Sequence, residues 1–350
     1  MPLTRSPLMT QHFAASAEFA EVDGWLVPAR FRSVEEETAH TRTGAVLYDL
    51  APHGVLELVG PDARKWANGM FTNNIRDLAV GACNRSAMGD EKGKVQGLLE
   101  VARTGEQSLV VMLDGVSPAA FSERYGKFII FDDVELTDLS EERTVVHLAG
   151  PKAGEVLALA GLPAVSVGEA AVVSDVVLLG RDRTGFGGVD VVVPKAAVNE
   201  LWGALRSAGA GVGGEEALES LRVRAGLARW PVDMGERALV HELRLVEACC
   251  NFNKGCYIGQ EVVNRVDVMG QVNKKLWGLR MEEDAIPPLE AEVRLGEQVV
   301  GVTRSGAREG GVARCLVMLK KAAWQPGLVV EVVAGGRTVR ATVSDLPFTS

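Results

Sequence analysis

A nine-residue stretch at 253–261, Asn-Lys-Gly-Cys-Tyr-Ile-Gly-Gln-Glu, brings a thiol, an amine, an amide and a carboxylate close together. Lys254 lies two residues before Cys256, and a nearby cation favours the thiolate, which is the form that attacks, ligates metal or is oxidised. The two glycines predict a tight loop rather than a continuous helix. If this loop is extended, Lys254, Cys256 and Gln260 should point to one side, because side chains alternate along an extended chain.

Length and composition indicate an ordinary globular protein of two or three domains, with 350 residues of which 47% are hydrophobic and 24% charged. The net charge of −9 argues against a broad nucleic-acid surface. No apolar run approaches the roughly 20 residues that cross a bilayer, so no membrane partner is expected. The five cysteines are scattered and include no C-x-x-C pair. A reducing cytoplasm therefore fits better than a disulfide framework or a zinc site.

A strand, a Gly-Pro turn and a helix occur twice, at 54–69 and 145–161. The repetition could be chance, or it could reflect a duplication that produced two similar lobes. Ser33 to Glu36 reads as a capping box that opens a helix ending at Gly44. Residues 1–32 show no clear periodicity and are expected to be irregular.

The later part of the chain changes character. Residues 172–179 and 189–193 are predicted strands on either side of a glycine-rich loop, and 215–226 is a predicted helix. From residue 276 onward, short alternating runs are separated by Gly or Pro, and the helical pattern nearly vanishes. This region is predicted to form a separate all-β domain, a small barrel.

Residues 254–261 resemble the K-G-C-[YF]-x-G-Q-E signature of the YgfZ family, which are folate-binding proteins related to the T-protein (aminomethyltransferase) of the glycine cleavage system. Weaker matches follow the same order along the chain. Residues 183–186 resemble the R-T-G-Y loop of T-proteins, and 221–226 resemble their L-R-x-E-A-G segment. The resemblance implies an α+β fold in which two interwoven α/β lobes and a C-terminal β-barrel surround a central channel that holds tetrahydrofolate or a derivative.

The resemblance also suggests domain boundaries. The first lobe is expected to comprise residues 1–50 and 140–240. The second is expected to comprise 51–139 and 241–275, and to carry the Lys-Gly-Cys-Tyr loop. The barrel is expected at 276–350.

Five residues are candidate folate contacts by this resemblance: Arg183, Phe186, Arg222, Glu242 and Tyr257. The guanidinium of Arg222 suits the folate carboxylates or the pterin edge, and an ion pair with Glu219 or Glu215 is the alternative. Tyr257 could stack on the pterin or simply pack in the core. For Arg183 and Phe186 the alternative is a plain hairpin loop.

Each residue of the signature loop has both a functional and a structural interpretation. Cys256 could be a functional thiol, reachable at the mouth of a pterin-sized opening, or a packed cysteine. Lys254 could lower the pKa of that thiol, hold an anion, or be a solvated lysine. The flanking residues Gly255, Gly259, Gln260 and Glu261 form the rest of the motif, and the last two could simply cap the following helix. One thiol cannot hold a cluster that needs about four ligands, so no permanent metal site is expected, only transient contact with an iron–sulfur cluster.

Two departures from T-proteins affect the expected activity. T-proteins carry a catalytic aspartate in a G-G-x-x-D-D pattern, but the matching segment here has Gly97 and Leu98. The T-protein asparagine of the following strand falls near Met112, and Arg224 replaces the acid of L-R-x-E-A-G. Without the aspartate, a folate nitrogen lacks its electrostatic partner.

The leading hypothesis is therefore a cytoplasmic, folate-binding accessory protein that acts through Cys256 in the assembly or repair of iron–sulfur enzymes, including tRNA-modifying enzymes. Its partners would be those client enzymes and a reduced folate, without direct nucleic-acid binding. One alternative is a tetrahydrofolate-dependent aminomethyltransferase or demethylase of the T-protein type. Another is a folate-free scaffold whose loop binds a protein partner.

Overall fold

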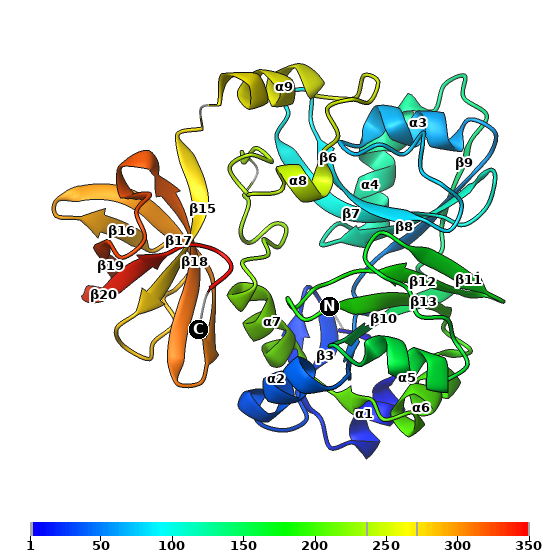
Figure 1. The fold of residues 1–350 in the computed structure, drawn as a ribbon, viewed down its shortest axis with the longest axis horizontal. Helices are drawn as coiled ribbons and strands as arrows, with labels where there is room; N and C mark the ends of the chain where they lie inside the picture. The colour runs from blue at the N-terminus through cyan, green and yellow to red at the C-terminus, as the bar shows by residue number, and fades with distance from the viewer. Residues whose placement is uncertain (1–2, 236, 271, 349–350) are drawn as a thin grey trace.

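The computed structural model describes residues 3–235, 237–270 and 272–348, which form two α/β lobes and a C-terminal barrel (Figure 1). In the first lobe a six-stranded sheet has the order β11-β12-β13-β10-β4-β14. Its strands are β11 (Ala170–Val173), β12 (Val176–Gly180), β13 (Gly188–Pro194), β10 (Arg143–Ala149), β4 (Val46–Asp49) and β14 (Gly211–Val212). Helices α5 (Ala153–Leu159) and α6 (Val198–Ser207) pack on this sheet through buried residues such as Leu157 and Trp202.

The strand predicted at 172–179 is instead a hairpin of β11 and β12, so that prediction is wrong. Ser174 takes a positive φ of 52° at the turn, between Val173 and Val176, which pair across the two strands. The polar pair Ser174-Asp175 is all that interrupts the apolar run here, and neither Gly nor Pro marks the turn.

The second lobe contains a five-stranded sheet of order β6-β7-β8-β5-β9. Its strands are β6 (Cys83–Gly89), β7 (Val95–Arg103), β8 (Ser108–Asp114), β5 (Val55–Val59) and β9 (Glu135–Asp138). The helices α3 (Ala63–Met70) and α4 (Pro118–Tyr125) and the 3-10 turn η1 (Gly126–Phe128) accompany it. The aromatic rings of Phe71, Phe121 and Tyr125 pack together in its core, with ring centroids 5.3–6.2 Å apart.

The repeated strand–turn–helix elements are confirmed as β5–α3 in one lobe and β10–α5 in the other. Both turns need glycine. Gly60 and Gly150 have φ of 141° and 112°, and a Cβ at either would lie within 2.4 Å of a backbone oxygen. The capping box is also present, since Ser33 and Glu36 cap α2 (Val34–Thr43) reciprocally.

Residues 4–30 are regular, so the expectation of an irregular N-terminus is wrong. They form β1 (Thr4–Arg5), α1 (Met9–Ala14), β2 (Glu18–Val22) and β3 (Trp25–Arg30), with β3 paired to both other strands. The strands are short and partly exposed, so they lack a clean alternating pattern. Tertiary packing supports them: a Cβ at Gly214, just before α7, would lie 2.2 Å from the carbonyl oxygen of Ala29 in β3.

The helix predicted at 215–226 is α7 (Glu215–Arg224), which lies between the first lobe and the barrel (Figure 1). The short α8 (Val246–Cys249) and α9 (Gln260–Met269) follow. The barrel prediction is confirmed: six strands close in the order β15-β18-β17-β16-β19-β20. They are β15 (Lys274–Met281), β18 (Val312–Lys320), β17 (Gln298–Glu309), β16 (Glu292–Leu295), β19 (Val329–Ala334) and β20 (Arg337–Ser344), with the 3-10 turn η2 (Lys321–Ala323) after β18.

The predicted fold class, two α/β lobes with a C-terminal barrel, is thus confirmed. The lobe boundaries proposed from the sequence stay a prediction. Within the described residues, no helix is both long and apolar enough to cross a membrane.

Candidate functional site

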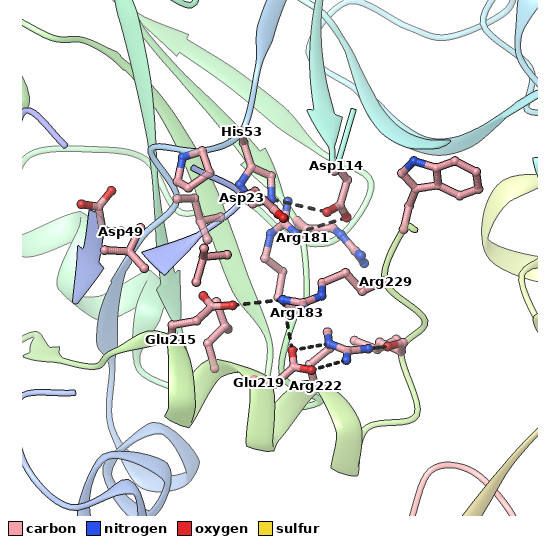
Figure 2. Close-up of a pocket in the computed structure, with 18 of the residues that line it drawn as sticks. Asp23, Asp49, His53, Asp114, Arg181, Arg183, Glu215, Glu219, Arg222 and Arg229 are labelled. Atoms are coloured by element: carbon pink, nitrogen blue, oxygen red, sulfur yellow. Dashed lines mark hydrogen bonds and ion pairs between the residues drawn. The ribbon is translucent and has the colours of Figure 1, made fainter. Parts of the chain in front are cut away.

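A cavity of about 870 Å³, counted with its open mouth, lies where both sheets meet α7 (Figure 2). Residues from β4, β6, β8 and α7, and from the segments that follow β4 and β12, line it. Its charged and titratable lining residues are Asp23, Asp49, His53, Arg85, Asp114, Arg181, Arg183, Glu215, Glu219, Arg222 and Arg229.

The charges of this lining balance, because five arginines face five carboxylates. A cavity of this kind suits a ligand that carries both donors and acceptors better than it suits a simple polyanion. The sequence identified two of these residues, Arg183 and Arg222, as candidate folate contacts, and both do line the cavity.

Arg183 is held rigidly from behind the cavity by Asp190 of β13. Its Nε and Nη2 donate to the Asp190 carboxylate at 2.9 and 3.0 Å, and His147 Nδ1 lies 2.8 Å from the same carboxylate. Burial would raise the pKa of Asp190, but Arg183 and His147 hold it well below the ordinary value. Burial also lowers the pKa of His147, which favours the neutral ring. The guanidinium of Arg183 is therefore fixed and fully charged beside the cavity.

Asp114, the last residue of β8, supplies a carboxylate that the sequence reasoning missed. Arg183 Nη1 lies 3.4 Å and Arg85 Nη2 3.6 Å from its Oδ2. Although burial opposes ionisation, Arg183, His53 and Arg85 keep the pKa of Asp114 well below its usual value. The sequence feature that could have indicated Asp114 is its place directly after the apolar run 109–113, at the end of a strand.

Asp114 stands directly across from Leu98 in the β7–β8 register. Directly opposite residues of an antiparallel pair have their Cα atoms about 4.5–5.5 Å apart and share a face of the sheet. Leu98, with Gly97, occupies the segment that matches the catalytic aspartate pattern of T-proteins. The neighbouring strand therefore brings an ionised carboxylate close to that place.

One face of α7 forms the opposite wall, with Glu215, Glu219 and Arg222 at helical spacing. Arg222 donates to Glu219 and Asp233, each at 2.8 Å, so it both lines the cavity and forms the ion pair considered as its alternative role. Burial and the charge of Glu219 raise the pKa of Glu215 to about 7, although Arg229 Nη1 lies 3.1 Å from it. This wall therefore contains one acid that titrates near neutral pH.

The signature loop lies apart from the cavity lining. Lys254 is 6% exposed, and its Nζ donates to the carbonyl oxygens of Phe71 and, at 2.6 Å, Asn73. The ammonium also lies 4.9 Å from the ring centroid of Tyr257. Cys256, by contrast, is exposed. The prediction that Lys254 and Cys256 share one direction is wrong, because the buried backbone carbonyls draw the lysine inward.

The glycines and polar residues around Cys256 shape the start of α9. Gly259 has φ of 78°, and a Cβ there would lie 2.3 Å from the carbonyl oxygen of Asp90, so only glycine fits. Gln260 begins α9 and accepts from the Tyr257 amide at 3.3 Å, while Glu261 lies in the first turn. Within the described residues of the helix, neither side chain caps an amide, but Glu261 stands where a carboxylate favours a helix N-terminus. Gly255 is exposed, and a Cβ there would meet nothing closer than 3.9 Å.

Three predicted folate contacts lie outside the cavity lining, and each has another partner. Glu242 accepts from the Leu239 amide at 2.9 Å. The ring of Phe186 lies 5.3 Å from the Arg224 guanidinium, and Tyr257 lies against Lys254. Among the residues that the structure describes, no cluster of His, Cys, Asp or Glu could hold a metal ion.

Comparisons with known proteins identify the family. The model of the GCVT N-terminal domain matches residues 8–254, and that of the glycine cleavage T-protein C-terminal barrel domain matches 274–349. An aminomethyltransferase from Symbiobacterium thermophilum is 30% identical over 99% of this chain and 97% of its own length. One from Rubrobacter xylanophilus is 27% identical over 99% and 94%, respectively.

The fold agrees with this result. The glycine cleavage system aminomethyltransferase T from Bartonella henselae superposes with a TM-score of 0.91 at 22% identity, covering 99% of this chain and 98% of the other. The chain therefore belongs to the glycine cleavage T-protein family, with a GCVT N-terminal domain followed by the T-protein C-terminal barrel.

Proposed function

We propose that the cavity binds a reduced folate and that the protein transfers an aminomethyl group to it, as a T-protein does. The curated relatives that align over nearly the whole chain are named aminomethyltransferases, which supports this activity over the other candidates. In this reaction tetrahydrofolate would supply the two nitrogens that accept the aminomethyl carbon, and ammonia would leave.

The residues present fit a folate. The pterin edge offers both donors and acceptors, and the cavity presents the anionic Asp114 beside the fixed cation of Arg183. His53 Nε2 lies 3.4 Å from Asp114, while its buried Nδ1 has no hydrogen-bond partner among the described residues. Buried polar atoms are normally satisfied, so this nitrogen is available to a ligand. Arg229 is 32% exposed and pairs with Glu215 at 3.1 Å, so a ligand carboxylate would have to share it with this acid.

The observation that carries the proposal is the carboxylate of Asp114 in the cavity lining, with Arg183 and Arg85 at 3.4 and 3.6 Å from its Oδ2. A fixed anion there can stabilise positive charge that develops on a folate nitrogen during transfer, and it does so without reorganisation. It would act in place of the aspartate that the segment at 97–98 lacks. Arg183 and Arg85 keep it ionised, so its role is electrostatic rather than that of a proton donor.

The test combines binding with turnover. Calorimetry with tetrahydrofolate should show saturable binding, and the protein should restore methylenetetrahydrofolate formation in a glycine cleavage system that lacks its aminomethyltransferase. Asp114→Asn should lower the transfer rate roughly 10²–10³-fold, the loss typical of one preorganised electrostatic group. The control is Asp77→Asn, because Asp77 is 57% exposed and its side chain pairs with its neighbours Arg76 and Asn74 on the surface, outside the cavity lining. No heat at millimolar tetrahydrofolate would instead favour the folate-free scaffold.

A second candidate function follows from Cys256, and it is the YgfZ-type role in iron–sulfur enzyme assembly or repair. Its support is the exposed thiol, which lies outside the cavity lining while Lys254 and Gly259 of the same loop are locked in place. An exposed thiol can contact a client enzyme transiently, whereas a folate in the cavity would not need it.

Complementation in cells distinguishes the iron–sulfur role from aminomethyl transfer. Cys256→Ser should fail to restore iron–sulfur enzymes, including those that modify tRNA, in cells that lack the protein. Cys83→Ser is the matched control, because Cys83 is buried and burial raises the pKa of its thiol to about 12. Full rescue by Cys256→Ser would remove the second candidate and leave the aminomethyltransferase proposal standing.

A further inference from the structure

Four arginines gather where the barrel meets the first lobe, and three of them contact one carboxylate. Arg42 lies in the last turn of α2, Arg224 ends α7, and Arg280 and Arg314 lie in the barrel strands β15 and β18. The carboxylate is that of Glu309, the last residue of β17. We call this group the arginine cluster.

Among the described residues, Glu309 is the carboxylate that lies within 4 Å of three of these guanidiniums. Arg314 Nη1 lies 3.2 Å and Arg224 Nε 3.4 Å from its Oε2, and Arg42 contacts its Oε1. Arg280 has no carboxylate within 4 Å among the described residues. Four cations and one anion leave a net charge of about +3, whereas the arginines and carboxylates that line the cavity are equal in number.

The strand register of the barrel makes this excess of positive charge more destabilising. Arg280 and Arg314 are directly paired across β15 and β18, a position at which like charges destabilise a sheet. Arg314 is only 8% exposed, and its buried Nε has no hydrogen-bond acceptor among the described residues; the same holds for Nε of Arg42. Buried donors without acceptors are unfavourable. An anion bound here would relieve both problems.

Burial, together with the neighbouring guanidiniums, lowers the pKa of both Arg42 and Arg314. This agrees with a shortage of negative charge. The site is nevertheless open on one side, because the side chains of Arg42 and Arg224 are 35% and 26% exposed.

The cluster is separate from the cavity. Arg222 faces the cavity, whereas Arg224 lies about 200° further around the helix at 3.6 residues per turn. On this other side of α7, Ser220 Oγ donates to the Arg308 carbonyl of the barrel at 2.8 Å. We propose that the arginine cluster is a second binding site, which takes the oxyanion of a ligand, a phosphate or a carboxylate group.

Guanidinium forks bind both kinds of oxyanion, so the experiment must separate the two sources. The full-length protein is titrated with inorganic phosphate in one arm and with tri-γ-glutamate, which carries carboxylates but no pterin, in the other. Chloride holds the ionic strength constant. The unfolding temperature and the calorimetric heat should respond saturably in at least one arm. A phosphate response indicates a phosphorylated ligand, and a response to tri-γ-glutamate indicates a polycarboxylate.

Two variants assign the site. Arg280→Gln should weaken oxyanion binding about tenfold or more, since it removes one charged contact. Without an anion, it should raise the unfolding temperature by removing the like-charge pair. Arg224→Gln, at the rim, should weaken binding similarly and provides a second test. Arg337→Gln, at an exposed barrel residue paired with Glu283, should change neither property.

The proposal does not depend on the aminomethyltransferase activity, because neither probe contains a pterin. It is overturned if neither phosphate nor tri-γ-glutamate acts beyond matched chloride. It is also overturned if Arg280→Gln and Arg224→Gln bind the responding anion as tightly as Arg337→Gln does.

Discussion

The strongest energetic prediction concerns Asp190, which holds Arg183 at the cavity. Both side chains are buried, and Asp190 itself is fully buried. In Asp190→Asn the guanidinium of Arg183 would keep its charge but lose its bidentate partner, and His147 would face an amide in place of a carboxylate. The variant therefore leaves an uncompensated charge inside the protein.

Removing one partner of a buried ion pair costs about 3–5 kcal/mol. Asp114, 3.4 Å from Arg183, offsets part of this loss, so we expect about 3 kcal/mol. The sign of the pH dependence follows from the lowered pKa of Asp190. Its stabilisation is complete at pH 7 and is lost only as the pH falls below the ordinary aspartate pKa of about 4 and on through the folded-state pKa.

Guanidinium chloride unfolding followed by circular dichroism at pH 7 measures this loss. The double variant Arg183→Met/Asp190→Leu removes both charges, and apolar replacement of a buried pair is often close to neutral. It should therefore be more stable than Asp190→Asn, although His147 loses its acceptor and Asp114 loses Arg183 and keeps Arg85 and His53. A loss below about 1 kcal/mol for Asp190→Asn, the value of a surface pair, would refute this reasoning. So would a double variant less stable than the single one.

Three further predictions concern stability. Lys254→Met should cost about 2–4 kcal/mol in chemical unfolding, because two buried carbonyls lose their donor, whereas Lys254→Arg should cost less. Gly259→Ala should cost at least about 2 kcal/mol, because a left-handed residue gains a Cβ that meets Asp90, whereas Gly255→Ala should be nearly silent. For Glu215, whose pKa is raised to about 7, the wild type should be most stable relative to Glu215→Gln below pH 4.3 and lose this advantage, about 3 kcal/mol, as the pH rises through 7. Parallel unfolding at pH 4.5 and 7.5 checks this, and a constant difference contradicts it.

The parts of the fold that the sequence predicts well are those set by neighbouring residues. The capping box of α2, the two Gly-Pro turns and the six alternating runs of the barrel all depend on short-range patterns, and all are present. The N-terminal strands were not predicted because they depend on packing with distant residues, and the turn at Ser174 was not predicted because only Ser174 and Asp175 mark it, without Gly or Pro.

The cavity could be predicted only in part, because its lining comes from segments between residues 22 and 230. Arg183 and Arg222 were found through family motifs. Asp114 was not predicted because a motif comparison tests one position in the sequence. The cavity requires only that a carboxylate lie at a given location in the fold, whichever strand supplies it. A neighbouring strand in register can supply it, as Asp114 does opposite Leu98. Register is a tertiary property, and a single sequence does not display it.

In the signature loop, residues whose types suggest chemistry instead stabilise the local structure. Lys254 satisfies two carbonyls, Gly259 lets the chain pass against Asp90, and Gln260 holds the Tyr257 amide. Each of these roles explains its residue without any chemistry. Cys256 is exposed and makes no side-chain hydrogen bond within the described part of the chain, so folding does not require a thiol there. The loop therefore isolates one residue at which loss of function without loss of stability is expected, and Cys256→Ser separates the two.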